Sequence, residues 1–249
     1  MSLHLDFSDK NIIVTGGTRG IGKEIAKQFL INGGSVTITG TKFIDVTILK
    51  KKWGFENISY QRVDFLQKES VTTFLEWINN QGKIDILVNN AGINKVDLNM
   101  DSMTSDFENL IDVNLKGPYL LSREVSAIMK KNKYGRIVNI SSIWGSITRS
   151  GRSLYSTTKF GLVGLTKTLA VELAPHGILV NAVAPGFTMT ELTKRTNTKK
   201  EIEDLKKTIP IRRLAEPIEI AKLILFITSD MNTYLTGQNI VIDGGYVNV

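Results

Sequence analysis

Two side chains that could exchange protons stand four residues apart in Tyr155-Ser-Thr-Thr-Lys159, and Ser142 lies upstream at the end of an apolar run. In a helix, this spacing places the phenol and the ammonium on one face. A free tyrosine has a pKa of about 10. A cation about 4 Å away, at an effective dielectric constant near 20, contributes roughly 4 kcal/mol, or about three pKa units. We therefore predict that Lys159 lowers the pKa of Tyr155 into the catalytic range. The alternative is two surface side chains on an amphipathic helix.

A glycine-rich turn near the start of the chain has the context of a dinucleotide-binding site. Residues 11–15 form a short β-branched run, and residues 23–30 have apolar side chains at helical spacing. Between them, Gly16, Gly20 and Gly22 follow the spacing G-x-x-x-G-x-G. Glycine allows the tight turn that brings backbone N–H groups against a pyrophosphate at a helix N-terminus. The turn predicts such a site, although a glycine-rich turn alone can be purely structural.

Taken together, these motifs resemble those of the classical short-chain dehydrogenase/reductases, and the likeness covers nearly the whole chain. Six motifs occur in the family's order and spacing. They are T-G-x-x-x-G-I-G from Thr15 to Gly22, N-N-A-G from Asn89 to Gly92, the family's catalytic asparagine at Asn114, its serine at Ser142, Y-x-x-x-K from Tyr155 to Lys159, and a Pro185-Gly186 turn followed by Thr188. Residues 237–245 also resemble the family's closing strand.

The resemblance implies a role for each site residue. Ser142 binds the substrate oxygen, and Tyr155 gives that oxygen a proton as hydride arrives from the nicotinamide. Lys159 holds the ribose hydroxyls. Asn114 holds a water in a proton relay to Lys159, or is a buried structural amide at a helix kink. Asp64 contacts the adenine, unless it is only a loop cap. The residues expected to bind the cofactor are Gly16, Thr18, Arg19, Gly20, Ile21, Gly22, Thr41, Lys42, Asp64, Asn90, Ala91, Gly92, Tyr155, Lys159, Pro185, Gly186 and Thr188.

The end of the second predicted strand decides which cofactor we expect. An NAD-preferring site places Asp or Glu there, bonded to the ribose 2′-hydroxyl. This chain reads Thr39-Gly-Thr-Lys42, and the first acid is Asp45. Arg19 stands directly before the second glycine of the turn, where a guanidinium can pair with a 2′-phosphate, and Lys42 is a second candidate. We therefore expect NADP, with NADPH preferred over NADH.

Strand-like runs alternate with helix-like segments along the whole chain, which favours parallel β-α-β units. The resemblance implies an α/β Rossmann fold: one doubly wound, seven-stranded parallel sheet in the order 3-2-1-4-5-6-7, with helices on both faces and ligands at the carboxyl ends of the strands. We expect residues 1–249 to form a single NAD(P)-binding domain, with 188–215 as a mobile substrate lid. The predicted strands are residues 11–15, 35–39, 58–63, 84–88, 136–140, 178–183 and 239–242.

Composition excludes several classes of function. The chain has no cysteine and only two histidines, His4 and His176, so a disulfide framework, a histidine triad and a metal site are not expected. No apolar segment reaches about 18 residues, and we expect a soluble, cytoplasmic protein. The net charge is +7, yet no nucleic-acid-binding motif accompanies it. A non-catalytic NADP(H) sensor on the same fold is a further alternative, but such relatives tend to lose the tyrosine or lysine.

The substrate is less well determined. The chain is most similar in general to 3-oxoacyl-[acyl-carrier-protein] reductases and their sugar- or polyol-specific cousins. Trp144, Arg149 and Arg152 occupy the stretch that walls the substrate pocket in relatives, where small neutral side chains are commoner in the acyl reductases. Lys133 and His176 stand where those reductases typically carry arginines for the acidic carrier. Residues 188–213 hold eight basic and four acidic side chains, so the lid would favour an anionic or carrier-bound substrate, unless it is only a solvated helix face.

We also expect a homotetramer. The segment 153–174 carries a wide apolar stripe that includes Leu154, Leu162 and Leu169, and the helix near 120–129 is apolar on one side. Relatives pair these two helices across a two-fold axis and pair again through the last strand, here residues 239–242. The alternative is that the surplus apolar surface packs on loops within one subunit.

Overall fold

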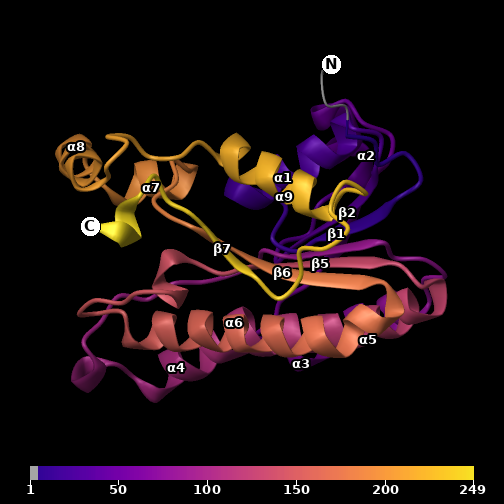
Figure 1. Ribbon diagram of the computed structural model, residues 1–249, viewed down its shortest axis with the longest axis horizontal. Coiled ribbons are helices and arrows are strands. Elements are labelled where there is room, and N and C mark those ends of the chain that lie inside the picture. Colours follow the sequence, from indigo (N-terminus) through magenta and orange to yellow (C-terminus); the bar gives the residue numbers. More distant parts are fainter. Residues whose placement is uncertain (1–4) are drawn as a thin grey trace.

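Seven parallel strands form one sheet through the centre of the computed structural model, which describes residues 5–249 (Figure 1). The sheet order is β3-β2-β1-β4-β5-β6-β7, which confirms the order that the family resemblance implied. His4 lies outside the described residues. The strands are β1 Asn11–Val14, β2 Ser35–Gly40, β3 Ile58–Arg62, β4 Ile86–Asn89, β5 Gly135–Ile140, β6 Ile178–Pro185 and β7 Asn239–Ile242.

The strand ends differ from the predicted ones by at most two residues, and the differences have local causes. Strand β4 begins at Ile86 rather than residue 84, and the Asp85 carboxylate just before it accepts a hydrogen bond from the backbone N–H of Asn11 (2.7 Å). Strand β6 continues to Pro185, which pairs with Ile242 of β7. A proline has no N–H to donate to a ladder, so it is tolerated at the end of a strand.

Helices cover both faces of the sheet and bury an apolar core against each (Figure 1). Helices α1, α2 and α9 supply side chains to the core on one face, and α3, α5 and α6 supply the core on the other. Central strands covered on both sides are apolar throughout, and β5 is buried at every position. The helices are α1 Gly20–Ile31, α2 Val46–Trp53, α3 Lys68–Asn79, α4 Thr104–Ile111, α5 Gly117–Asn132, α6 Ser153–Leu173, α7 Glu191–Thr196, α8 Lys199–Thr208 and α9 Pro217–Thr228.

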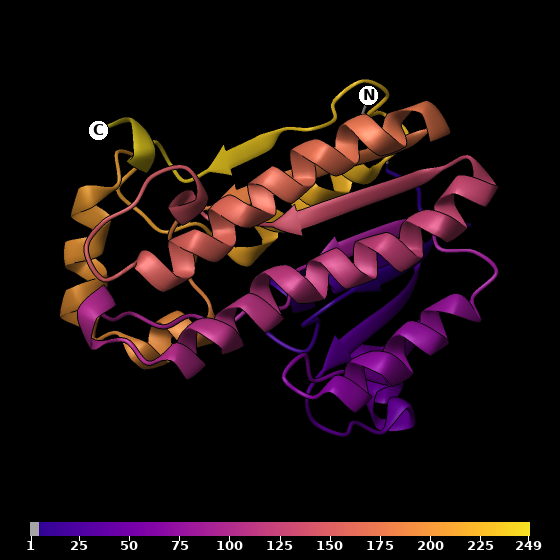
Figure 2. The ribbon, with the colours of Figure 1, turned by 90° about the horizontal axis from the view of Figure 1, so that it is seen from below.

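The two longest helices, α5 and α6, lie side by side across one face (Figure 2). Helix α5 does not start independently, because a π-helical turn over Asp112–Lys116 joins it directly to α4. A single π-helical turn inside an α-helix is rare and occurs frequently at functional sites. This turn places Asn114 inside the molecule, beside α6.

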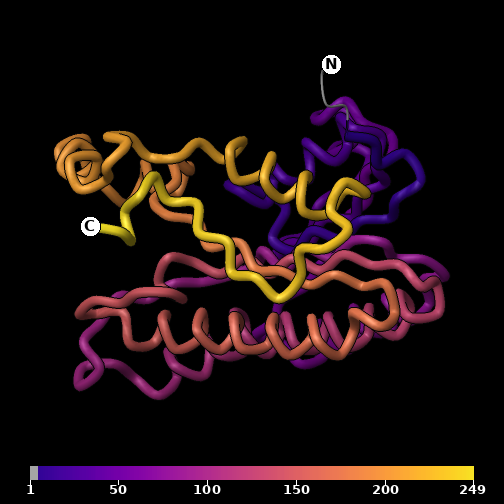
Figure 3. Tube along the Cα trace, viewed as in Figure 1, coloured from indigo at the N-terminus to yellow at the C-terminus, as the bar shows by residue number. Residues whose placement is uncertain are grey.

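Helices α7 and α8 lie in an excursion whose two ends are tied together by the backbone. The N–H of Met189 donates to the carbonyl of Ala215 (2.8 Å), and the N–H of Ala215 donates to the carbonyl of Phe187 (2.9 Å). Helix α8 begins with a capping box between Thr198 and Glu201. The chain trace ends beside these helices (Figure 3).

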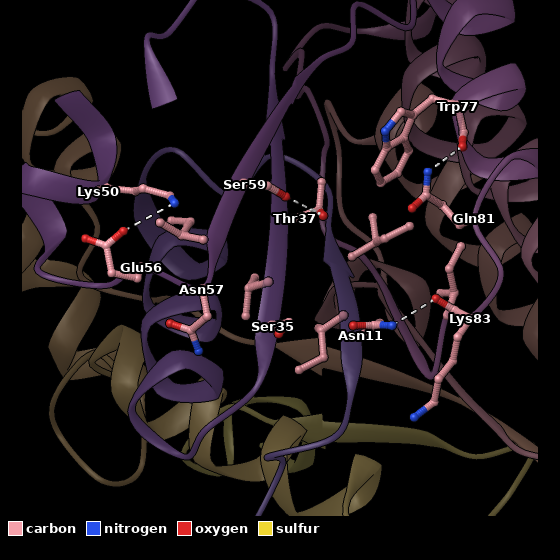
Figure 4. Close-up of a pocket in the computed structure, with 15 residues that line it drawn as sticks. Asn11, Ser35, Thr37, Lys50, Glu56, Asn57, Ser59, Trp77, Gln81 and Lys83 are labelled. Atoms are coloured by element: carbon pink, nitrogen blue, oxygen red, sulfur yellow. Dashed lines mark hydrogen bonds and ion pairs between the residues drawn. The ribbon is translucent and has the colours of Figure 1, made fainter. Parts of the chain in front are cut away.

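A cavity of about 380 Å³ lies at the amino end of the sheet, at the opposite edge from the glycine-rich turn (Figure 4). Polar side chains line it, and they bond to one another: Thr37 to Ser59 (2.7 Å) and Lys50 to Glu56 (3.3 Å). It contains none of the predicted site residues. Within residues 5–249, no helix is both long and apolar enough to cross a membrane.

Candidate active site

The four predicted catalytic side chains come from three segments of the chain that meet where β4 and β5 end. Ser142 follows β5, Tyr155 and Lys159 lie on the first turns of α6, and Asn114 lies on the π-helical turn. These elements are joined directly: Asn114 Nδ2 donates to Thr158 Oγ1 of α6 (3.2 Å). Carboxyl ends of parallel strands are where ligands bind in open α/β sheets. The structure therefore brings the predicted catalytic group together.

Lys159 is buried, with 4% of its surface exposed, and its ammonium donates to the carbonyl oxygen of Ile140 (2.8 Å) at the end of β5. Nζ lies 5.4 Å from the centre of the Tyr155 ring. Burial disfavours the charged amine and lowers the pKa of Lys159 to about 8. The side chain can therefore gain or lose a proton close to neutral pH.

The expected lowering of the Tyr155 pKa is not what the structure gives. Burial is the largest influence and raises the pKa of Tyr155 to about 12, while a hydrogen bond with Ser142 and the positive charge of Arg152 act in the lowering direction. Our estimate placed the Lys159 ammonium close to the phenol oxygen. Instead, Nζ donates to the carbonyl of Ile140. Burial also disfavours the charged form of both groups, the Tyr155 phenolate and the Lys159 ammonium. Tyr155 is a protonated phenol at neutral pH.

Asn114 joins the loop after β4 to the π-helical turn. Its amide nitrogen donates to the carbonyl of Ile93, and its amide oxygen accepts from the N–H of Ile93, both at 2.9 Å. A methyl group added to Gly92 would lie 3.3 Å from Asn114 Oδ1 and 3.8 Å from Lys159 Nζ. Asn114 is therefore a buried structural amide at a helix irregularity, and it lies in the same small space as Lys159.

The glycine-rich turn is pinned against the loop after β4. Asn90 Nδ2 donates to the carbonyls of Thr15 (2.8 Å) and Gly16 (3.2 Å). Gly16 has φ +64°, and a methyl group on Gly22 would lie 2.2 Å from Asn90 Nδ2. No other residue fits at Gly22 without displacing this amide, so glycine is needed for the turn to pack against Asn90 at the start of α1.

Basic side chains lie at the carboxyl ends of β2 and β3, and no acid lies directly after β2, where an NAD-preferring site would place one. Asp45, the nearest following acid, caps α2 by accepting from the N–H of Thr47 (2.7 Å). Arg19 is exposed at the start of α1, and Lys42 is exposed just after β2. The sequence reasoning missed Arg62, which ends β3 in register with Gly40 and donates from Nε to the carbonyl of Thr41 (3.1 Å). The sequence did contain a sign of this role, because Arg62 is a basic residue near the end of the third predicted strand.

The remaining predicted cofactor residues have structural partners of their own. Asp64 Oδ1 accepts from the N–H of Leu66 (3.1 Å), so the loop cap considered as its alternative is present. The N–H of Gly186 donates to Ile242 (2.9 Å), and Thr188 Oγ1 bonds to the carbonyl of Gly186 (3.2 Å). Thr18, Gly20, Ile21, Thr41 and Ala91 lie on the turn at the start of α1 or on the strand-end loops beside it. A glycine-lined helix start with cations at the next strand ends fits a dinucleotide carrying a 2′-phosphate.

Trp144, predicted to wall the substrate pocket, lies in a short helical turn that Ser142 caps through a bond from the N–H of Trp144 (3.2 Å). Arg149 and Arg152 both lie over its ring, with guanidinium carbons 5.1 and 5.2 Å from the ring centre. Phe187 and Tyr246, which the sequence reasoning did not single out, complete the cluster. Among the described residues, no group of His, Asp or Glu side chains is arranged to hold a metal ion.

Comparison with known proteins agrees with the family resemblance found in the sequence. The family described as "Enoyl-(Acyl carrier protein) reductase" matches residues 16–247. The chain is 41% identical over 250 residues to the 3-oxoacyl-[acyl-carrier-protein] reductase FabG of Aquifex aeolicus, covering 98% of this chain and 99% of that protein. The chain belongs to the short-chain dehydrogenase/reductase family.

Two solved structures of this family resemble the fold closely. ElxO with NADP bound superposes with a TM-score of 0.89 at 36% identity, covering 96% of this chain and 99% of that one. A gluconate 5-dehydrogenase from Burkholderia cenocepacia, in complex with NADP and tartrate, gives a TM-score of 0.90 at 27% identity, covering 99% and 98%. The Rossmann fold and family predicted from the sequence are therefore confirmed.

Proposed function

We propose that this short-chain dehydrogenase/reductase is an NADPH-dependent reductase that converts a 3-oxoacyl thioester, carried on an acyl-carrier protein, to the 3-hydroxyacyl thioester. The observation that carries the proposal is the meeting of Ser142, Tyr155 and Lys159 at the end of β5, opposite the glycine-rich turn. The class, an NADP-dependent oxidoreductase, is supported by the NADP-bound structural relatives. The acyl substrate is supported by the 3-oxoacyl-[acyl-carrier-protein] reductases to which the chain is similar.

Ser142 and Tyr155 hold the substrate oxygen. Ser142 is close enough to Tyr155 to act on its pKa in the lowering direction, so one carbonyl oxygen could accept from both hydroxyls. NADPH, when bound, supplies the hydride to the carbonyl carbon. Tyr155 then donates its proton to the alkoxide that develops, and the Ser142 hydroxyl stabilises that charge. A phenol with a pKa of about 12 is still a stronger acid than an alcohol, whose pKa is near that of bulk water at about 15.7, so this transfer is downhill.

Lys159 has two tasks in this scheme. Its ammonium stabilises the Tyr155 phenolate that remains after proton transfer, and with a pKa of about 8 it can pass on a proton of its own. Gly92 leaves room beside Lys159 Nζ and Asn114 Oδ1. We propose that a water there relays a proton from solvent to Lys159, with Asn114 orienting it.

Three cations on the adenosine side favour the phosphorylated cofactor. Arg19 and Lys42 are joined there by Arg62, which is exposed and whose Nε donates to the Thr41 carbonyl. A guanidinium presents two parallel donors to a phosphate, whereas NADH would leave the three charges unpaired. We propose that this group sets the preference for NADPH.

The chain would act as one domain with residues 188–215 as its lid. The paired backbone bonds at Met189 and Ala215 form a narrow base about which α7 and α8 could move together. Three of the eight basic side chains in this segment are paired: Lys206 with Glu203, Lys207 with Asp204, and Arg213 with Glu219 of α9. This supports a solvated helix face more than a dedicated binding surface for an anionic substrate.

We further propose that the active form is a homotetramer in the cytoplasm. Large apolar side chains remain exposed on the face formed by α4, α5 and α6, which supports pairing with a second copy. They are Phe107 (40% exposed), Tyr119 (49%), Phe160 (47%) and Val171 (78%). Lys133 and His176 lie at the far ends of α5 and α6 from Tyr155, so within one subunit they do not line the site.

The decisive experiment measures NADPH oxidation with a panel of carbonyl compounds. It compares 3-oxoacyl-carrier-protein, a 3-oxoacyl N-acetylcysteamine thioester, an oxo sugar acid and an uncharged ketone. We expect the highest kcat/KM with the carrier-bound 3-oxoacyl group. A higher kcat/KM with the oxo sugar acid would instead favour a sugar-acid reductase, the second candidate that the gluconate 5-dehydrogenase relative supports. NADPH binding without turnover of any carbonyl would point to a cofactor sensor.

A further inference from the structure

Two arginines are stacked on one indole at the entrance to the site. Trp144 lies in a buried turn and is only 5% exposed. Arg149 and Arg152 lie 5.1 and 5.2 Å from its ring centre, within the range of a cation–π interaction. Phe187 and Tyr246 pack edge-on to it, each with ring centres 6.4 Å away. The ring cluster therefore fixes two flexible cations in one place.

The charge of this pair is not compensated within the subunit. Across residues 5–249, neither Arg149 nor Arg152 has a carboxylate within 4.0 Å, whereas Arg123 and Arg213 each pair with a glutamate. Arg152 Nη1 donates only to the amide oxygen of Asn94 (3.3 Å), and its Nε is buried without a partner. Burial and the neighbouring Arg149 lower the pKa of Arg152. A partly buried guanidinium with an unused donor and a like-charged neighbour is stabilised when an oxyanion binds.

Arg152 is also close to the reacting atoms. It stands three residues before Tyr155 where α6 begins, and residues three apart lie on one face of a helix. The electrostatic contact is direct enough for the Arg152 charge to act on the Tyr155 pKa in the lowering direction. An anion held by Arg152 would therefore lie near the carbonyl that Tyr155 protonates.

We propose that Arg149 and Arg152, mounted on Trp144, form an oxyanion-binding subsite that selects a carbonyl substrate carrying a carboxylate or a phosphate. The inference rests on the proposed function only in assuming that Tyr155 serves carbonyl reduction. Arg152 would bind the anion through the terminal nitrogen that does not donate to Asn94, and Arg149, which is exposed, adds charge beside it. The subsite thus adds recognition of an oxyanion to the carbonyl reduction proposed for Tyr155.

Two chemical groups could supply the oxyanion, and they differ in their distance from the carbonyl that is reduced. One is a carboxylate on the oxo compound itself, a few bonds from the carbonyl. The other is the phosphodiester of a carrier's phosphopantetheine arm, which is many bonds away. The nearness of Arg152 to Tyr155 favours the carboxylate, whereas Arg149 is exposed and could meet a more distant phosphate.

The test compares three substrates in the wild type, Arg152→Gln and Arg123→Gln. The substrates are a short 3-oxo acid, a 3-oxoacyl phosphopantetheine and the uncharged 3-oxoacyl N-acetylcysteamine thioester. Arg152→Gln removes the charge but keeps a polar side chain. In this variant, kcat/KM for an anionic substrate divided by kcat/KM for the uncharged substrate should fall at least about tenfold relative to the wild type. Arg123, which is exposed and paired with Glu124, provides the matched arginine control and should leave that ratio unchanged. A fall for the oxo acid alone identifies the carboxylate source, and a fall for the phosphopantetheine alone identifies the phosphate.

A second readout does not depend on turnover. Malonate is titrated calorimetrically into the protein saturated with NADP, and it should bind the wild type at least about tenfold more tightly than Arg152→Gln. An unchanged substrate ratio together with equal malonate affinity overturns the subsite, even if thioesters are reduced well. Malonate binding that depends on Arg152, in a protein that reduces no carbonyl, would keep the subsite and overturn the proposed function.

Discussion

The buried ammonium of Lys159 should make the stability of this reductase depend on pH in a way that can be measured. In the folded chain the pKa of Lys159 is lowered from 10.5 to about 8 by burial. In the unfolded chain the side chain is solvated and keeps its ordinary value. Below pH 8 the folded state must therefore hold a charge whose burial is unfavourable, and this penalty disappears as the pH rises.

The sign and size follow from proton linkage. Between the two pKa values the unfolded state binds one proton more than the folded state at this site, so the free energy of unfolding rises with pH. Each unit contributes 1.36 kcal/mol, and the limiting penalty at low pH is about 3 kcal/mol. Between pH 7.5 and pH 9.5, where tyrosines in the unfolded chain are still protonated, the expected gain from this one group is about 2 kcal/mol.

Urea unfolding of the wild type and of Lys159→Met isolates this contribution. The substitution also leaves the Ile140 carbonyl without its donor, which costs about 1–3 kcal/mol at any pH. The informative quantity is therefore the difference in the free energy of unfolding between wild type and Lys159→Met at pH 9.5, minus the same difference at pH 7.5. We expect about 2 kcal/mol in favour of the wild type. Lys167→Met, at an exposed position on the same helix, serves as control and should show no such change.

A difference between wild type and Lys159→Met that stays constant within about 0.5 kcal/mol over this range would refute the reasoning. It would mean that Lys159 remains charged above pH 9, and hence that the buried ammonium is stabilised by more than the Ile140 carbonyl. The proton-relay role proposed for Lys159 would then lose its basis, because the side chain could not release a proton near neutral pH.

Further predictions concern the reaction, the cofactor and the assembly. Tyr155→Phe should retain NADPH binding, measured by fluorescence, but lose at least about two orders of magnitude in turnover, since general acid catalysis is worth about 10²–10⁴-fold; near-normal turnover would exclude the mechanism. Arg19→Ala should narrow the preference for NADPH over NADH by roughly 1.5–3 kcal/mol, and Arg62→Ala should narrow it in the same direction; a wild type that uses both cofactors equally would contradict this. Light scattering at micromolar concentration should give the mass of four chains, and Phe160→Glu on α6 should reduce it; a single-chain mass for the wild type would rule out the assembly.

The strands could be predicted because their signals are local, whereas the order of the sheet came from the family resemblance. A run such as Ile86 to Val88 is apolar and buried at every position, as expected for a central parallel strand. The glycines of the first turn are also local signals, since Gly16 adopts a positive φ and Gly22 must admit the Asn90 amide. Motif spacing then placed Ser142, Tyr155 and Lys159 correctly on their elements.

Features of the site that depend on distant segments were not predictable in the same way. The Trp144 cluster draws Phe187 from the segment after β6 and Tyr246 from the end of the chain, and no local pattern links these three rings. The bond from Arg62 to Thr41 depends on the register of β2 against β3. The π-helical turn that buries Asn114 likewise follows from contacts with Ile93 and Thr158 rather than from its own sequence.

The Tyr155 pKa shows why pairwise reasoning from sequence fails at a buried site. The four-residue spacing correctly placed a cation beside the phenol, with Nζ 5.4 Å from the ring centre. It could not show that both groups leave water together, which raises the pKa of Tyr155 and lowers that of Lys159. An ion pair would require the pKa of Tyr155 to be lower than that of Lys159, but the two values are about 12 and about 8. The resting site therefore holds a protonated phenol. That state is the one that carbonyl reduction needs, because the proton must be on Tyr155 before the alkoxide forms.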